Sequence, residues 1–175
     1  EMTDKAESHA VSVFARNLRN LLLQPPIHGS RVLAVDPGYR SGCKLVALDE
    51  FGNTLGHGVI LLVGKHHRKS KAVETVTDLV DRFGLKVIVI GNGTACRETE
   101  DFFAELISGD LKDRDLAYVI VNEAGASVYS TSRLGREEFP QYDAILRGAI
   151  SIGRRLQDPL SELVKIDPAR IGVGL

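Results

Sequence analysis

The chain has 175 residues, 43% of them hydrophobic, which is enough for one domain that buries roughly 70% of the unfolded surface. Its 22 basic and 23 acidic side chains leave a net charge of −1, which excludes a nucleic-acid binder that relies on overall positive charge. No stretch can cross a bilayer or act as a signal peptide, and Cys43 and Cys96 lack disulfide or zinc spacing, so we expect a cytoplasmic protein with reduced thiols.

The first part of the chain predicts an amphipathic helix. Apolar residues recur at helical spacing from Val11 to Leu22, and the pattern stops at Gln24-Pro25-Pro26. The apolar stripe of this helix must cover another surface, either in the following domain or in a partner. We therefore predict that residues 1–28 are a helical segment from a preceding region.

The rest of the chain alternates between strand and helix patterns. Three β-type segments come first, and the turn Glu50-Phe51-Gly52-Asn53 makes the second and third antiparallel. Right-handed crossovers then add the two later strands in parallel to the first. We predict an α/β fold with a mixed five-stranded sheet, a three-stranded meander plus two parallel strands, flanked by helices. The predicted strands are Arg31–Asp36, Cys43–Asp49, Thr54–Ile60, Lys86–Ile90 and Tyr118–Asn122, and the predicted helices are Ser70–Phe83, Thr94–Ile107, Gly125–Arg136 and Tyr142–Leu156.

Two carboxylates follow strands of this sheet. Asp36 closes the first strand directly before Pro37-Gly38, and Glu123 follows the last strand directly before a run of small residues. Open α/β sheets bind ligands at the carboxyl ends of their strands, so the two acids share one rim if their strands are neighbours. Each acid also has a purely structural explanation, because Asp before Pro-Gly suits a turn and Glu123 suits a helix N-terminus.

The pair is harder to explain than either acid alone. Two carboxylates about 4 Å apart repel by about 4 kcal/mol at an effective dielectric constant of about 20. A divalent cation, a proton, or a base such as Arg40 or Lys44 must offset this repulsion.

The arrangement resembles the ribonuclease H-like fold and, within it, the YqgF and RuvC group. The segment Val32–Lys44, with its Val-Asp-Pro-Gly-Tyr-Arg core, resembles the opening of the YqgF-like domain in the Tex family of bacterial transcription accessory proteins. Ile90–Ala95 and Asn122–Ser130 resemble the same domain, and Leu146–Leu160 is the strongest match. The helical N-terminus and the tail Glu162–Pro168 match as well, so the resemblance covers nearly the whole chain.

The resemblance implies a larger protein. Family members have helical regions before this domain and helix-hairpin-helix and OB-type RNA-binding domains after it. By this resemblance, residues 1–28 belong to the preceding helical region, residues 29–160 form the YqgF/ribonuclease H-like domain, and residues 161–175 are a linker toward a C-terminal region. The implied partners are nucleic acid (RNA or DNA), the transcription machinery, and the flanking domains of the same chain.

The resemblance also implies a site. Nucleases of this fold use three or four carboxylates to hold two Mg²⁺ ions about 3.5 to 4 Å apart. Asp36 and Glu123 match the first two catalytic, metal-binding acids. The third comes from the last helix, where Asp143 lies about 200° around the helix from Ile145, which we expect on the buried face. The matching position is near Ile145 or Arg147, and neither binds a cation; only a frayed helix start would swing Asp143 inward.

We therefore predict a nucleic-acid-associated binding or scaffolding module with a degenerate nuclease site and no required cofactor. The alternative is a Mg²⁺- or Mn²⁺-dependent nuclease, resembling a Holliday-junction resolvase, with Asp143 as the third acid. A third reading makes Asp36–Gly42 the phosphate loop of an actin-like ATPase. We disfavour it because such enzymes close two domains around the nucleotide.

Two further segments are candidates for phosphate contacts. Lys65, Arg68, Lys69 and Lys71 form the one strongly basic run and can contact nucleic-acid phosphates without reading sequence, although no aromatic residues are interleaved to stack bases. The turn Gly91–Thr94 leads from a strand into a helix, where backbone amides can cradle a phosphate. The acidic residues that follow favour a plain turn with Thr94 as the helix cap.

Overall fold

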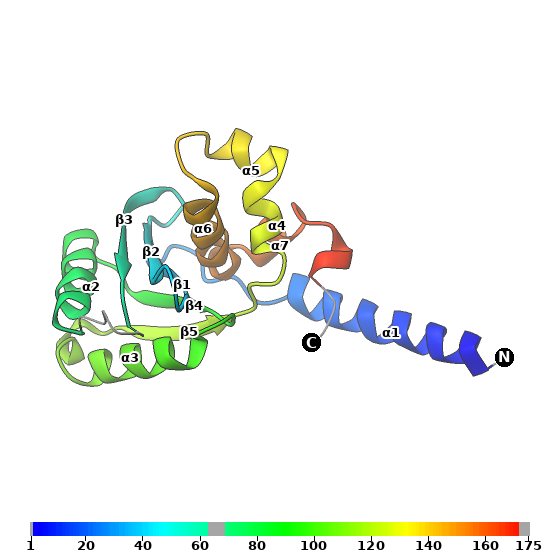
Figure 1. Cartoon of the computed structure of the whole chain (residues 1–175), viewed down its shortest axis with the longest axis horizontal. Helices are drawn as coiled ribbons and strands as arrows, with labels where there is room; N and C mark the ends of the chain where they lie inside the picture. Colours follow the sequence, from blue (N-terminus) through cyan, green and yellow to red (C-terminus); the bar gives the residue numbers. More distant parts are fainter. Residues whose placement is uncertain (1, 63–68, 172–175) are drawn as a thin grey trace.

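The computed structural model describes residues 2–62 and 69–171. Its centre is a five-stranded sheet in the order β3-β2-β1-β4-β5 (Figure 1). β1, β2 and β3 form an antiparallel meander, and β4 pairs in parallel with both β1 and β5. The predicted fold class is therefore confirmed. The strands are β1 (Val32–Asp36), β2 (Cys43–Leu48), β3 (Thr54–Ile60), β4 (Val87–Gly91) and β5 (Ala117–Val121).

Helices cover both faces of the sheet. α2 and α3 pack on one face, and α6 packs on the other beside α4 (Figure 1). The single helix predicted from Gly125 to Arg136 is wrong in one respect, because Ser132 interrupts it and caps a new helix by accepting a 3.0 Å hydrogen bond from the Gly135 amide. The helices are α1 (Met2–Leu22), α2 (Lys69–Phe83), α3 (Cys96–Ser108), α4 (Ala126–Thr131), α5 (Arg133–Glu138), α6 (Ala144–Gln157) and α7 (Pro159–Leu163), with 3-10 turns η1 (Lys112–Arg114) and η2 (Pro168–Arg170).

Within the described ranges, no helix combines the length and apolar character needed to cross a membrane. Both cysteines are free thiols, and Cys43 is buried in the sheet.

α6 packs against the sheet with no room for a side chain at Gly153. A Cβ added to Gly153 would lie 2.6 Å from Leu48 Cδ1 and 2.8 Å from the Ala34 Cβ. The predicted buried stripe of this helix is correct except at Ile145, which is 48% exposed because the first turn lies at the rim of a cleft rather than over the core. The other members of that stripe, Ala149, Ile152 and Leu156, are buried.

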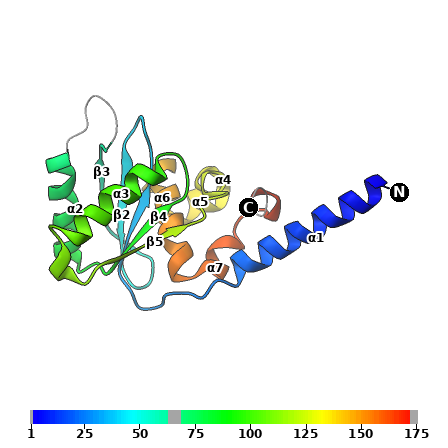
Figure 2. The same ribbon diagram turned by 90° about the horizontal axis from the view of Figure 1, so that it is seen from below.

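The N-terminal helix is joined to the domain at one end only. α1 projects away from the sheet in two perpendicular views (Figures 1 and 2). Leu21 is its one buried residue among those described, and it packs in a cluster with Tyr129, Leu163, Ile166 and Ile171. Leu163, Ile166 and Ile171, which belong to the segment predicted as a linker, thus pack against α1 and α4. The division into a preceding region, a domain and a linker stays a prediction.

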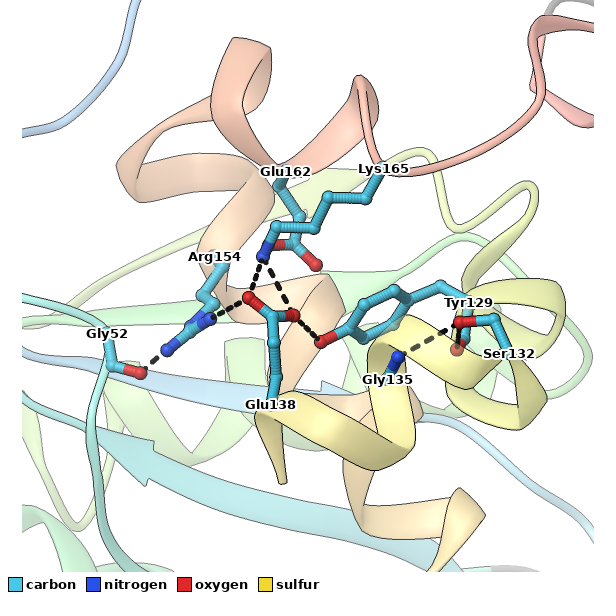
Figure 3. Close-up of polar contacts among 8 residues, drawn as sticks. All are labelled: Gly52, Tyr129, Ser132, Gly135, Glu138, Arg154, Glu162 and Lys165. Carbon is cyan, nitrogen blue, oxygen red and sulfur yellow. Dashed lines mark hydrogen bonds and ion pairs between the residues drawn. The ribbon is translucent and has the colours of Figure 1, made fainter. Parts of the chain in front are cut away.

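A polar cluster fixes the C-terminal helices to one another (Figure 3). The Glu138 carboxylate accepts hydrogen bonds from the Tyr129 hydroxyl and, at 3.0 and 3.1 Å, from Lys165 Nζ. Arg154 Nη1 lies 3.9 Å from the same carboxylate, and Arg154 Nε donates to the Gly52 carbonyl at 3.0 Å. Burial raises the pKa of Glu138, but these partners prevail and hold it below its ordinary value.

Candidate functional site

A cleft of about 320 Å³ opens where β1 ends, between this end of the sheet and helices α4 and α6. Its charged side chains are Asp36, Lys44 and Glu123. The rest of the lining comes from the loop after β1 and from small and apolar residues of α4 and α6: Pro37, Ser41, Gly42, Ala126, Ser127, Ser130, Ala144, Ile145, Gly148 and Ile152. The structure thus brings the two predicted acids into one cavity.

Asp36 is positioned by the pairing of β1 with β2. Four buried residues precede it in β1, and the antiparallel register places it directly opposite Lys44 on the same face of the sheet. Burial raises the pKa of the Asp36 carboxyl, and the positive charge of Lys44 opposes that rise.

Glu123 reaches the cleft by a route that we did not predict. The predicted common rim depended on the strands of the two acids being neighbours, but β4 lies between β1 and β5. The Glu123 side chain passes over the end of β4, where two glycines leave room for it. A Cβ added to Gly91 would lie 2.3 Å from Glu123 Oε2, and one added to Gly93 would lie 1.8 Å from Oε1.

The Gly91–Thr94 turn is therefore built to hold a carboxylate of the protein itself. Asn92 fixes the same segment, because its Oδ1 accepts a 3.0 Å hydrogen bond from the Glu123 amide. Thr94 is not the helix cap that we predicted, since α3 begins at Cys96 after Ala95, whose φ of 68° is left-handed. With Glu123 filling the space beside both glycines, the turn has no room there for a phosphate.

The Glu123 carboxylate is poorly compensated. Its Oε2 is buried and has no hydrogen-bond partner among the described residues. Burial raises the pKa of Glu123, the negative charge of Asp36 raises it further, and the Gly93 amide and Arg155 oppose the rise. The effect of Asp36 on Glu123 follows from their sharing one cleft.

The start of α6 supplies no third acid to the cleft lining. Asp143 is exposed and caps the helix, with Oδ1 accepting a 2.8 Å hydrogen bond from the Leu146 amide. A Cβ added to Gly148 would lie 3.9 Å from Asp36 Oδ2, so the helix position that faces Asp36 carries no side chain.

Arg147, near the position that matches the third acid, does not line the cleft. Its guanidinium is buried and donates to the carbonyls of Ser130 at 2.7 Å and Tyr142 at 2.9 Å. The cation in the cleft is Lys44, which comes from β2 and which we had considered only as one of several bases.

These residues do not fit a two-metal centre. Such a centre needs three or four carboxylates, whereas the cleft offers Asp36, Glu123 and an ammonium group. Across residues 2–62 and 69–171, no group of three or more His, Cys, Asp or Glu side chains is arranged to hold a metal ion.

The basic run is only partly described by the structure. Lys65 and Arg68 lie outside the described residues. Lys69 pairs with the Glu105 carboxylate of α3 at 2.6 and 2.7 Å, and Lys71 is exposed. Neither Lys69 nor Lys71 lines the cleft. Their contact with nucleic acid stays a prediction.

The sheet order, the two acids at the ends of β1 and β5, and the helix that closes the cleft define a ribonuclease H-like fold. A solved structure of this class supports the assignment, that of *Thermus thermophilus* RuvC in complex with a Holliday junction substrate. It aligns with a TM-score of 0.50 over 77% of this chain and 95% of that chain, at 9% identity. At this identity the likeness shows the fold alone.

The chain belongs to the family of the Tex protein YqgF-like domain, whose family model matches residues 30–157. It is 50% identical over 99% of its length to Uncharacterized protein YdcI of *Bacillus subtilis* (strain 168), and 47% identical over 99% to Transcriptional accessory protein Tex of *Neisseria gonorrhoeae*. It is also 47% identical over its whole length to the human S1 RNA-binding domain-containing protein 1. The chain spans 24%, 22% and 18% of the lengths of these three relatives.

Proposed function

We propose that this chain is a nucleic-acid-associated binding and scaffolding module of a Tex-like transcription accessory protein, with a degenerate nuclease site. The observation that carries the proposal is the composition of the cleft. α6, the helix from which the third acid of an active nuclease would come, turns Gly148 toward Asp36 and adds no acid to the cleft lining, and Lys44 adds a positive charge that works against metal ions. Family membership and the names of the relatives supply the transcription and RNA-binding context.

The partners follow from the same context. The longer protein would contact RNA or DNA and the transcription machinery, with flanking helical, helix-hairpin-helix and OB-type domains, in the cytoplasm. The module itself requires no cofactor, although Mg²⁺ or Mn²⁺ can be tested as additions.

Nucleic acid would bind outside the cleft. With Asp36, Glu123 and Lys44 ionised, the cleft carries a net charge of one negative unit and repels a phosphate. The exposed Lys71 of the basic run is better placed to contact phosphates without reading sequence.

The alternative is a metal-dependent nuclease or resolvase, and a cleavage assay separates the two. The chain is incubated with labelled Holliday junctions and RNA–DNA hybrids in Mg²⁺ or Mn²⁺, beside its Asp36→Asn variant. We expect no cleavage by either protein. Metal-dependent cleavage that disappears in Asp36→Asn would establish the nuclease and overturn the degenerate site.

Binding is tested separately, by fluorescence anisotropy with a labelled single-stranded RNA over a series of salt concentrations. We expect weak binding that falls with salt, and Lys71→Glu should reduce the slope of log K against log salt by roughly one. Lys112→Glu is the matched control, because Lys112 is exposed on η1, far along the chain from the basic run. Equal effects of the two substitutions would show that only overall charge matters.

A further inference from the structure

The charge balance of the cleft depends on one lysine. Neither Asp36 nor Glu123 takes part in any of the ion pairs found among residues 2–62 and 69–171, although both lie partly buried in the same cavity. Lys44 is the one basic side chain of the cleft lining. Two carboxylates and one ammonium therefore share one partly buried cleft.

The position of Lys44 is fixed by the backbone. It projects from β2 opposite Asp36, is only 9% exposed, and donates from Nζ to the carbonyls of Ser41 at 2.5 Å and Gly42 at 2.8 Å. An ammonium group has three N–H donors. Two of them anchor the loop after β1, and the third has no partner in the described part of the chain.

Burial lowers the pKa of Lys44 despite the acidic groups near its ammonium. Burial disfavours its charge, while the negative charges of Asp36 and Asp143, together with Cys43, favour it. Lys44 in turn favours the charged form of Asp36. Glu123 adds a second negative charge to the same cleft.

We propose that Lys44 is the resident cation of this cleft, and that its ammonium offsets the charge of Asp36 and so excludes Mg²⁺ and Mn²⁺. The Lys44 ammonium would repel a divalent ion in the cleft. The α6 position that faces Asp36 is Gly148, so this helix would supply no carboxylate ligand there. The inference concerns metal affinity and does not require that the chain bind nucleic acid.

The test is a titration of the whole chain with Mn²⁺. Binding is measured by calorimetry and by the electron paramagnetic resonance signal of free Mn²⁺. Wild type should show no saturable binding at millimolar Mn²⁺. Lys44→Met, which keeps the length of the side chain but not its charge, should bind Mn²⁺ at least tenfold more tightly. Asp36→Asn in the Lys44→Met background should remove that gain, because it removes the ligand.

Lys44→Arg is the matched control, because it keeps the positive charge and should exclude Mn²⁺ as wild type does. Gly148→Asp provides a second route if Lys44→Met fails to fold. Gly148→Asp adds an acid toward Asp36 but keeps the positive charge of Lys44. This variant should therefore bind Mn²⁺ more weakly than the Gly148→Asp/Lys44→Gln double variant.

Two results would overturn the proposal: wild type that binds Mn²⁺ as tightly as Lys44→Met, or Lys44→Arg that binds as tightly as Lys44→Met. Either result would leave the RNA-binding measurement unaffected, so the two proposals fail separately.

Discussion

Glu138 and Glu123 are both partly buried carboxylates next to α6, and their surroundings act on them in opposite directions. Glu138 accepts hydrogen bonds from Tyr129 and Lys165, and its pKa is lowered (Figure 3). Glu123 has an oxygen without a partner in the described structure and faces a second acid, and its pKa is raised. The first carboxylate stabilises the fold, whereas the second costs stability. Charged side chains that lower the stability of the fold are typical of functional sites, whether the site is still active or has lost its activity.

Arg155 links the two regions, and removing it should have the largest effect. Its Nη1 donates to the carbonyls of Asn122 at 2.6 Å and Ala124 at 2.9 Å, on either side of Glu123. Burial lowers the pKa of Arg155 to about 10, against the attraction of Glu162 and Glu123. We expect Arg155→Ala to lower the free energy of unfolding by about 3 kcal/mol, because it leaves buried acceptors and acids uncompensated.

Urea unfolding followed by circular dichroism measures this loss. The control is Arg133→Ala, whose side chain is 87% exposed and should change stability by less than about 0.5 kcal/mol. A loss for Arg155→Ala as small as that of the control would show that the two regions are not coupled through this arginine.

Glu138→Gln should have the next largest effect, about 2 kcal/mol at neutral pH, because it removes the charge that Tyr129, Lys165 and Arg154 share. The folded-state pKa lies below the ordinary value of 4.5, so the stabilisation is present above that value and is lost as pH falls through the folded pKa. Thermal unfolding of wild type and variant over a range of pH should therefore converge in acid.

The neighbouring Glu137→Gln is the control for this substitution, since Glu137 pairs only with the exposed Arg133 in the described chain and should contribute about 0.3 to 0.5 kcal/mol. Equal losses for the two variants would mean that the cluster adds nothing beyond a surface ion pair.

Glu123→Gln should have the smallest effect and the opposite sign. Its folded-state pKa lies above 4.5, so the charged side chain costs stability at neutral pH, and this cost disappears as pH falls below the unfolded value. We expect the variant to melt about 2 °C higher than wild type at pH 7 and at the same temperature near pH 4. Glu74→Gln on the exposed face of α2 should leave both melting points unchanged. If Glu123→Gln melted at a lower temperature than wild type at pH 7, the charge of Glu123 would not destabilise the fold and this prediction would be wrong.

Local patterns in the sequence were sufficient for the elements and for the two acids. Alternation and helical spacing placed the five strands and most helices, because these patterns depend on near neighbours in the chain. The placement of Asp36 and Glu123 after strands predicted their common rim. Capping chemistry was less reliable, as Thr94 and Ser132 show, because several nearby residues compete to end or begin a helix.

The sequence by itself determined the class of fold and the presence of two carboxylates at its ligand-binding edge. Tertiary structure alone decided how these acids meet: Glu123 reaches across the end of β4 over two glycines, Lys44 lies beside Asp36 on β2, and Gly148 faces Asp36. It also turned Arg147 toward backbone carbonyls and left Ile145 at the rim. These features depend on glycines, which carry no side chain, and on the order of the strands in the sheet. Strand order brings together residues that are far apart in the chain, so it leaves no periodic signal in the local sequence.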